Sequence, residues 1–273
     1  MTRSADYVFG GEQNELERLL GQAADLKPET SWLLDRIGVG RGWRAADVGC
    51  GPIGILDLLS EHVGPEGAVV GVEREPRFAA MARTEIERRS LQNVLIVEGD
   101  MLAAELDEGS FDLVHERLVL INVPEDDRGS IVAAMLRLAR PGGTLALESW
   151  DRASHVCYPE HPAWQILNDA YREAVRTTIG AGTSGRTLPW LLRSAGVIDV
   201  HTKVHVRAVE VGDRRRTHRL GILDVAKARI LATGRLSEAE FDAHRAALAE
   251  HLANPDTLLI DQLFVQAWGT KPR

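Results

Sequence analysis

The sequence predicts an α/β fold with a seven-stranded, mostly parallel sheet and additional helical insertions. In the middle of the chain, short runs rich in β-branched residues alternate with longer segments whose apolar residues recur at helical spacing. This alternation is typical of a parallel sheet covered by helices. The first run leads directly into a glycine-rich turn, at the place where open α/β folds bind ligands.

Five runs are expected to form the parallel part of the sheet, and two later runs are expected to complete it. The five runs comprise residues 45–48, 68–72, 94–97, 111–115 and 144–148, and the two later runs comprise 204–211 and 263–268. Between them, Pro76 suits the first turn of a helix. Glu125 begins a second helix with carboxylates that favour its N-terminus, and Pro141 is expected to end it.

Further helices are expected outside this alternating segment. They comprise residues 12–24, 28–37, 164–178 and 220–230, and a last helix that begins after Ser237. Ser237 and Glu240 have the spacing of a capping box, in which each side chain satisfies a backbone N–H of the other residue.

The expected organisation has three parts. Residues 1–40 form N-terminal helices, residues 41–153 form a ligand-binding core, and residues 154–273 complete the sheet. Insertions at about 155–190 and 212–256 are expected, together with the N-terminal helices, to cap the carboxyl ends of the strands.

Composition and charge exclude several classes of protein. The 273 residues are 44% hydrophobic and 26% charged, as in globular domains. Lys and Arg total 32 against 40 for Asp and Glu, and a net charge of −8 disfavours general binding to nucleic acids or anionic membranes. Cys50 and Cys157 match neither a metal site nor a disulfide framework. We find no signal peptide and no membrane-spanning run, and therefore expect a cytoplasmic protein. No cluster of His, Cys and Asp residues has the spacing of a metal site, so we expect no metal.

The turn after the first run contains Gly49, Gly51 and Gly54, which have the spacing of the dinucleotide-binding fingerprint. Glu73 ends the second run, about 20 residues later, where an acid that binds ribose hydroxyls is expected. Glycines allow the backbone to approach a ligand closely, and a carboxylate can accept hydrogen bonds from both hydroxyls. The pattern therefore predicts that a nucleotide-like ligand binds here.

Five segments resemble, in order and spacing, the motifs of the class I S-adenosylmethionine-dependent methyltransferases. They comprise residues 47–54, 70–73, 97–101, 111–116 and 138–145. More loosely, residues 7–10 and 265–269 are similar to bacterial small-molecule and natural-product methyltransferases. The resemblance implies a Rossmann-like core, S-adenosylmethionine as cofactor, and methyl transfer to a small molecule.

The resemblance also implies roles for individual residues. It assigns Glu73 to the ribose, Asp100 to the adenine amino group and Met101 to the adenine ring. Asp47 suits a ligand that carries an ammonium and a sulfonium, whereas it would repel a pyrophosphate. The remaining residues that the resemblance places near the cofactor are Gly49, Cys50, Gly51, Arg74, Gly99, His115 and, folded over it from the N-terminus, Tyr7.

Two histidines are candidates for a general base. His155 follows the fifth run on the side where open α/β folds bind ligands, and His115 ends the fourth run beside the expected cofactor. Glu148 and Asp151 are competing candidates, and a carbon acceptor would need no base. The basic run 214–216 is interpreted as a solvated loop, with a phosphate or carboxylate of the substrate as its alternative partner.

The acceptor is expected to be hydrophobic, because large apolar residues gather in the insertions. They are Trp164, Leu167, Tyr171, Leu188, Trp190, Leu220, Leu223 and Phe241. Oxygen, nitrogen and carbon acceptors all stay open, and so does a homo-oligomeric state. Two alternatives remain from the sequence: an NAD(P)-dependent oxidoreductase, favoured by the glycine spacing, and a ligand-binding protein without catalytic activity.

Overall fold

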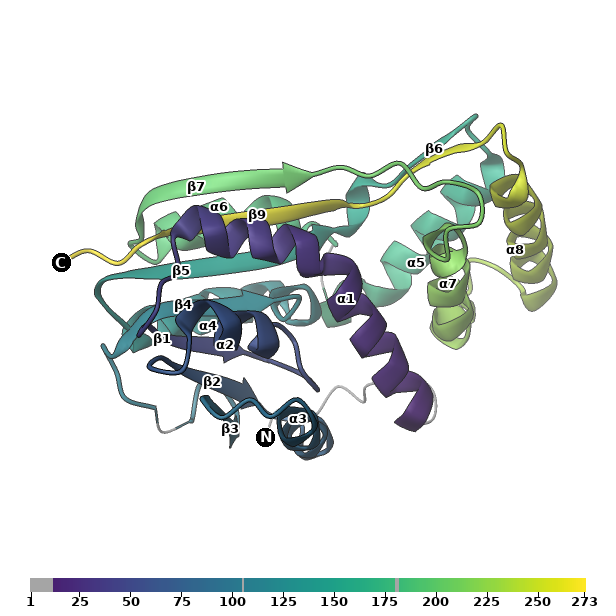
Figure 1. Ribbon diagram of the computed structural model, residues 1–273. Coiled ribbons are helices and arrows are strands. Elements are labelled where there is room, and N and C mark those ends of the chain that lie inside the picture. Colours follow the sequence, from purple (N-terminus) through teal and green to yellow (C-terminus); the bar gives the residue numbers. More distant parts are fainter. Residues whose placement is uncertain (1–11, 105, 180–181) are drawn as a thin grey trace. The chain divides into compact units, whose positions relative to one another are not determined.

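The computed structural model describes residues 12–104, 106–179 and 182–273, and these residues fall into two compact units (Figure 1). The first, which we call the core unit, comprises residues 12–149 together with Arg186–Lys203 and Val265–Arg273, as far as they are described. The second, the helical unit, contains Trp150–Gly185 and Val204–Phe264.

A seven-stranded sheet runs through the core unit and confirms the predicted fold class. Its strands are β1 (Arg44–Val48), β2 (Ala68–Glu73), β3 (Val94–Glu98), β4 (Phe111–Arg117), β5 (Ala139–Asp151), β7 (Ile198–His205) and β9 (Leu263–Thr270). Their order in the sheet is β3-β2-β1-β4-β5-β9-β7, and every neighbouring pair from β3 to β5 is parallel. The order reverses between β1 and β4, and the carboxyl ends of strands at such a reversal form the ligand site of open α/β folds.

Helices of the core unit pack their apolar faces on this sheet. They are α1 (Glu12–Ile37), α2 (Leu56–Val63), α3 (Pro76–Arg88), α4 (Glu125–Leu138) and α6 (Ser184–Ser194), with a short 3-10 helix η1 (Leu120–Asn122). Leu33 and Leu34 of α1 and Leu56 and Leu59 of α2 belong to one buried cluster, together with Leu113 of β4.

Two of the expected helix boundaries are wrong. α1 is one continuous helix with Pro28 inside it, whereas two helices were expected. A proline inside a helix costs about 3 kcal/mol, and the burial of Leu33 and Leu34 beyond it offsets that cost. α4 ends at Leu138, before Pro141, because β5 already begins at Ala139 and includes that proline beside a register shift against β4.

The strand expected at 204–211 lies earlier in the chain, at Ile198–His205. Apolar residues continue beyond His205 through Val211, with a change of phase at Ala208–Val209, so the pattern could not indicate which part pairs with the sheet. Val206 and Val211, which follow β7, are 64% and 53% exposed.

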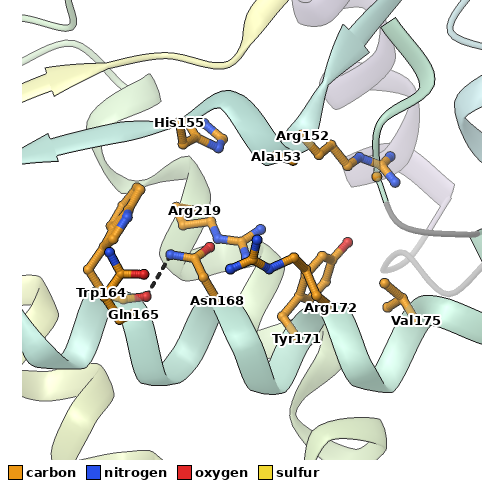
Figure 2. A pocket seen from close by; sticks show the side chains of 11 residues that line it. Arg152, Ala153, His155, Trp164, Gln165, Asn168, Tyr171, Arg172, Val175 and Arg219 are labelled. Atoms are coloured by element: carbon orange, nitrogen blue, oxygen red, sulfur yellow. Dashed lines mark hydrogen bonds between the residues drawn. The ribbon is translucent and has the colours of Figure 1, made fainter. Parts of the chain in front are cut away.

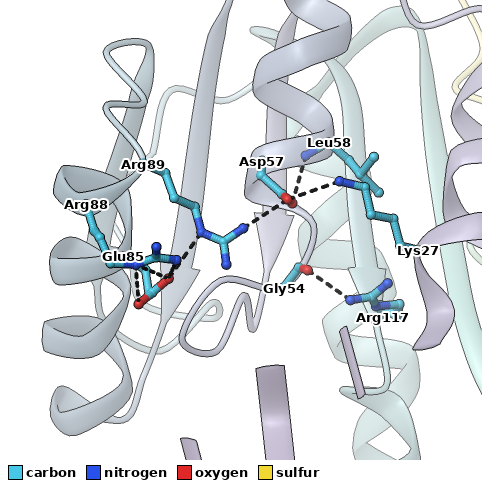
Figure 3. A network of polar contacts seen from close by, with 8 residues as sticks. All are labelled: Lys27, Gly54, Asp57, Leu58, Glu85, Arg88, Arg89 and Arg117. Atoms are coloured by element: carbon cyan, nitrogen blue, oxygen red, sulfur yellow. Dashed lines mark hydrogen bonds and ion pairs between the residues drawn. The ribbon is translucent and has the colours of Figure 1, made fainter. Parts of the chain in front are cut away.

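Polar contacts join three helices of the core unit at its surface (Figure 3). Asp57 of α2 accepts hydrogen bonds from Lys27 of α1 at 3.4 Å and from Arg89, just after α3, at 3.1 Å. Arg89 also donates to Glu85 of α3 at 3.1 Å. Exposed pairs of this kind contribute little stability singly, so the buried leucines remain the main support of these helices.

The helical unit has a hydrophobic core of its own. It consists of α5 (Pro162–Ile179), α7 (Arg215–Ala232) and α8 (Glu238–Ala253), with the 3-10 turn η2 (Arg152–Ser154) and the antiparallel strands β6 (Val156–Tyr158) and β8 (Leu258–Ile260). Leu167, Leu223 and Phe241 lie in its buried cluster. The predicted capping box is confirmed: Ser237 accepts from the Glu240 N–H, and Glu240 accepts from the Ser237 N–H at 2.8 Å.

The basic run 214–216 is not the solvated loop that was expected, because it begins α7. Arg216 is only 5% exposed. Its guanidinium donates to the carbonyl oxygens of Val209 at 2.7 Å, Asn254 at 2.9 Å and Thr257 at 2.5 Å, and also to that of Leu252. These bonds join the start of α7 to the segment after α8.

Within the described residues, no helix is long and apolar enough to cross a membrane.

Candidate functional site

The glycine turn and the acid after β2 meet at the carboxyl edge of the sheet. One carboxylate oxygen of Glu73 accepts a hydrogen bond from the Gly51 N–H at 2.9 Å, and the other accepts from the Glu75 N–H at 2.9 Å. Burial raises the pKa of Glu73, while these two hydrogen bonds and Arg74 act in the opposite direction. Each oxygen keeps a lone pair for a further donor, so the carboxylate can still accept from a diol.

Two glycines in the turn are required for different reasons. Gly54 has φ +49°, and a Cβ there would lie 2.5 Å from the Cys50 carbonyl oxygen and 2.7 Å from Asp47 Oδ2. Gly51 has φ +56°, but a Cβ there would meet no atom within 4 Å. Gly54 permits close packing, whereas Gly51 leaves open space beside the backbone that a ligand can approach.

The segment 97–101, the third of the five segments with the methyltransferase resemblance, lies next to Glu73. The Gly99 N–H donates to the Glu73 carbonyl oxygen at 2.9 Å, which holds the end of β3 against the end of β2. Asp100 follows and is exposed, although its Oδ1 accepts from the Leu102 N–H at 2.9 Å. Met101 is half-buried. The structure thus brings together Gly51, Glu73 and Gly99, with Asp100 one residue further along.

Cys50, between the two outer glycines, contributes no side chain to this edge. It is 2% exposed, and its sulfur lies 2.8 Å from the position that a Cβ on Gly71 would take. Burial, together with the charges of Asp47 and Glu73, raises the pKa of the thiol well above its ordinary value. Only the backbone of Cys50 is therefore available to a ligand.

Two further residues were expected near the cofactor. Arg74 is exposed, and Tyr7 lies outside the described residues.

Asp47 and His115 form part of a buried charged network. Nδ1 of His115 lies 2.8 Å from Oδ1 of Asp47, and Nε2 lies 2.8 Å from Oε1 of Glu148. His115 and Glu148 are 0% exposed, and Asp47 is 2% exposed. Burial lowers the pKa of His115, but the hydrogen bonds and charges of the two carboxylates outweigh burial and raise this pKa to about 9.

The geometry argues against His115 as a general base. With both ring nitrogens donating to carboxylates, the imidazole is a cation at neutral pH and has no lone pair for a proton. Because no part of the ring is exposed, it also has no surface for a cofactor. Glu148, a competing candidate, is equally buried, so the network joins β1, β4 and β5 and presents no base.

Sequence reasoning missed the outer members of this network. Thr30 of α1 donates to Glu148 at 2.9 Å, and Gln266 of β9 donates to the other Glu148 oxygen at 2.6 Å. Arg117 donates to Thr30 Oγ1 at 3.0 Å. It also donates to the Gly54 carbonyl oxygen at 2.9 Å (Figure 3). Nothing in the local pattern around Thr30 or Gln266 could have indicated a contact with Glu148, which is 118 residues away from each of them in sequence.

Sequence reasoning also missed the buried carboxylate of Glu116, which lies near the end of β4. Glu116 is fully buried, and one of its oxygens accepts from the Val119 N–H at 3.0 Å and the Leu120 N–H at 3.3 Å. Burial raises its pKa to about 7, against the lowering effect of these hydrogen bonds and of His115. Its position fixes η1 after β4.

The helical unit contains a pocket of about 210 Å³ (Figure 2). It lies between α5, the segment around η2, and α7. Six of its eleven lining residues carry a basic or amide side chain, namely Arg152, His155, Gln165, Asn168, Arg172 and Arg219. No Asp or Glu is among the lining residues in the part of the chain that the structure describes.

The pocket is less apolar than expected. Trp164 and Tyr171 line it, as the sequence suggested, but Leu167, Leu220, Leu223 and Phe241 are buried in the core of the helical unit. Their helical spacing reflects packing of α5, α7 and α8 on one another. Leu188 is buried and Trp190 is 65% exposed, and both belong to the core unit.

His155 lies in the wall of this pocket. Nε2 is 3.0 Å from Oδ1 of Asp261, and Nδ1 is buried without a hydrogen-bond partner among the described residues. The ring packs edge-on against Trp164, with centroids 5.9 Å apart. Asp261, which sequence reasoning missed, therefore orients the imidazole through one nitrogen and leaves the other unengaged. Asp151, the other competing candidate for the base, is buried, with 1% of its surface exposed.

Comparison with known proteins identifies the domain in the core unit. Residues 45–143 match the family model described as a methyltransferase domain. Demethylmenaquinone methyltransferase from Listeria welshimeri is 28% identical over 158 residues, which are 57% of this chain and 64% of that enzyme. The chain thus spans less than two thirds of the length of this relative.

Two solved structures share the fold. Phosphoethanolamine N-methyltransferase 2 from Haemonchus contortus, in complex with S-adenosyl-L-methionine, has a TM-score of 0.54 and 16% identity over 90% of this chain and 53% of that chain. Geranyl diphosphate C-methyltransferase from Streptomyces coelicolor has a TM-score of 0.52 and 15% identity over 90% of this chain and 76% of that chain. Residues 45–143 thus match the model of a methyltransferase domain, and the chain shares its fold with S-adenosylmethionine-dependent methyltransferases of solved structure.

Proposed function

We propose that this protein transfers a methyl group from S-adenosylmethionine to a small molecule. The observation that carries the proposal is the convergence of Gly51, Glu73 and Gly99–Asp100 at the carboxyl edge of β1, β2 and β3. These residues lie inside the segment that matches the methyltransferase domain model.

The residues at this edge fit the proposed cofactor. Glu73 would accept from the ribose hydroxyls, and the exposed carboxylate of Asp100 would accept from the adenine amino group. The open side of Gly51 would admit the ligand next to the backbone. Bound S-adenosylmethionine supplies an electrophilic methyl group on a sulfonium. The protein then has to hold the acceptor in line with the methyl–sulfur bond, and such positioning supplies much of the rate acceleration.

The same edge is poorly suited to a dinucleotide. In dinucleotide sites, backbone N–H groups of the glycine turn bind the pyrophosphate. Here the Gly51 N–H already donates to the carboxylate of Glu73, and Asp47 lies buried beneath the turn. A pyrophosphate would have to displace one anion and approach another, which is why we prefer the sulfonium cofactor to NAD(P).

Calorimetric titration tests the cofactor. We expect saturable binding of S-adenosylmethionine and S-adenosylhomocysteine, and none of NADH. Glu73→Gln should weaken S-adenosylmethionine binding by about tenfold or more, because a charge-assisted hydrogen bond is lost. Glu98→Gln is the matched control, since Glu98 also ends a strand but its side chain pairs with Arg83 at 3.2 Å. An unchanged affinity in Glu73→Gln would remove this residue from the site.

For acceptors that must lose a proton, we propose His155 as the base. Asp261 accepts from Nε2, so the neutral imidazole carries its lone pair on Nδ1, a buried atom that the acceptor would have to reach from the pocket. A base would take the proton of an acceptor O–H or N–H, and the oxygen or nitrogen lone pair would form the new bond to carbon. The methyl–sulfur bond breaks, and its electron pair stays on sulfur.

Turnover of a metabolite library, followed as formation of S-adenosylhomocysteine, tests this role. His155→Gln should lower kcat about 100-fold or more without changing the affinity for S-adenosylmethionine. His244→Gln, on α8 of the same unit and outside the pocket lining, is the control. Near-native turnover of His155→Gln would favour a carbon acceptor or positioning alone.

The same proposal includes the cellular setting. A protein of this kind would act in the cytoplasm on a free metabolite, in natural-product or related metabolism, and not on nucleic acid. The charge of −8 supports the last point. Light scattering after gel filtration would establish whether it works as a monomer or a homo-oligomer.

A further inference from the structure

Arg219 is a buried arginine that lines the pocket of the helical unit. It is 6% exposed, its guanidinium lies 4.4 Å from the ring centroid of Tyr171, and its Nε has no hydrogen-bond partner among the described residues. Arg216, three residues earlier on α7, is equally buried but donates to four carbonyl oxygens. The comparison within one helix shows that Arg219 is not a structural arginine of that kind.

The surroundings of Arg219 are positively charged. Arg152 and Arg172 line the same pocket, and the lining described by the structure includes no carboxylate. Burial lowers the pKa of Arg219 to about 10, with Tyr171 opposing the shift and the charges of Arg152 and Arg172 adding to it. Arg219 nevertheless stays charged at neutral pH. Arg172 pairs with Asp169 at 2.5 Å, but both side chains of that pair are about half exposed.

We propose that this pocket binds the anionic oxygen group, carboxylate or phosphate, of a small organic molecule, with Arg219 as its main partner and Arg172 at its rim. A buried guanidinium without acceptors is costly, and an anion that accepts from it removes that cost. Assignment of this anion to the methyl acceptor rests on the proposed function. The acceptor would then carry an acid group in addition to the atom that is methylated.

The volume limits the size of the bound part. A cavity of about 150 Å³ holds benzene, so a pocket of about 210 Å³ admits one aromatic ring with its acid group. Trp164 and Tyr171 supply apolar surface for such a body.

Calorimetry with four probes tests the proposal: benzoate, phenyl phosphate, inorganic phosphate and the neutral benzamide. Benzoate or phenyl phosphate should bind at least about tenfold more tightly than benzamide. Preference for benzoate identifies a carboxylate site, and preference for either phosphate identifies a phosphate site. The proposal is overturned if neither organic anion shows saturable binding up to about 10 mM, or if benzamide binds equally well.

Variants tie the binding to Arg219. Arg219→Met should weaken the preferred anion by about tenfold or more, Arg219→Lys should recover part of the loss, and Arg245→Met on α8 should change nothing. If circular dichroism shows that Arg219→Met does not fold, Arg172→Met should still weaken the anion by about threefold. Unchanged anion affinity in the variants that fold overturns the proposal. Titration of S-adenosylmethionine in the same samples tests the proposed function separately.

Discussion

The two units stabilise a buried cation in different ways. In the core unit, His115 lies between the carboxylates of Asp47 and Glu148, so its charge is compensated by ions. In the helical unit, Arg216 is surrounded by neutral backbone carbonyls, and its charge is solvated rather than neutralised. The first arrangement can lose its cation when the pH rises, because the pKa of His115 is about 9. The helical unit also retains positive charge that is available to a ligand.

The largest effect is expected where compensation is ionic. His115→Leu would leave Asp47 and Glu148 buried without their cation, and breaking such a set costs about 3–5 kcal/mol of unfolding free energy. Urea unfolding followed by circular dichroism measures this loss. His62→Leu is the matched control, because His62 also lies 3.2 Å from a carboxylate, that of Asp35, but at the surface. A loss below about 1 kcal/mol in His115→Leu, as expected for His62→Leu, would contradict the ionic account.

The pH dependence sharpens the contrast. The pKa of His115 rises from 6.5 to about 9 on folding, so its contribution is complete below about pH 6.5 and is lost as the pH rises through about 9. This contribution is on the order of 3 kcal/mol. Glu116, whose pKa is raised to about 7, contributes fully below about pH 4.5 and loses this contribution as the pH rises from about 4.5 to 7. The difference between wild type and His115→Leu should therefore shrink between about pH 7 and pH 10, and a constant difference would refute the assignment.

The helical unit should respond to Arg216→Met by about 2–3 kcal/mol, because several carbonyl oxygens lose a charged donor. Unlike the loss of unfolding free energy in His115→Leu, this loss should be the same at about pH 7 and about pH 10. Arg215→Met, next to it in sequence, removes a partly exposed pair with Asp213, whose side chains are 23% and 24% exposed, and should cost less than about 1 kcal/mol. Equal effects of the two substitutions would show that the carbonyl contacts of Arg216 contribute little.

The smallest effect is expected at the start of α8. Ser237→Ala removes the side-chain acceptor of the capping box and should cost about 1 kcal/mol, measured as a lower urea midpoint. Ser237→Asp, which keeps an acceptor at this position, should retain most of the stability. If both variants behave alike, the capping box does not control the stability of α8.

Sequence reasoning succeeded where local pattern and chemistry coincide. The strand from Arg44 to Val48, the turn that follows and Glu73 are adjacent in sequence or separated by one helix, so short-range spacing defines them. It failed where distant contacts decide. The burial of Arg216 depends on carbonyls up to 41 residues away, and a run of three arginines is the same in sequence whether its last member is solvated or buried. Arg219, one turn later, carried no signal of its own.

The place of β9 in the sheet has a consequence for how this protein is made. The last strand in sequence lies between β5 and β7, both of which leave the ribosome long before it. Until residues 263–270 are synthesised, the backbone groups of β5 on that side have no strand to pair with, and an unpaired strand edge invites association with other chains. A premature stop before residue 263 would thus remove an interior strand rather than a dispensable tail, and we expect such a product to be a substrate for chaperones and proteases instead of a shortened enzyme.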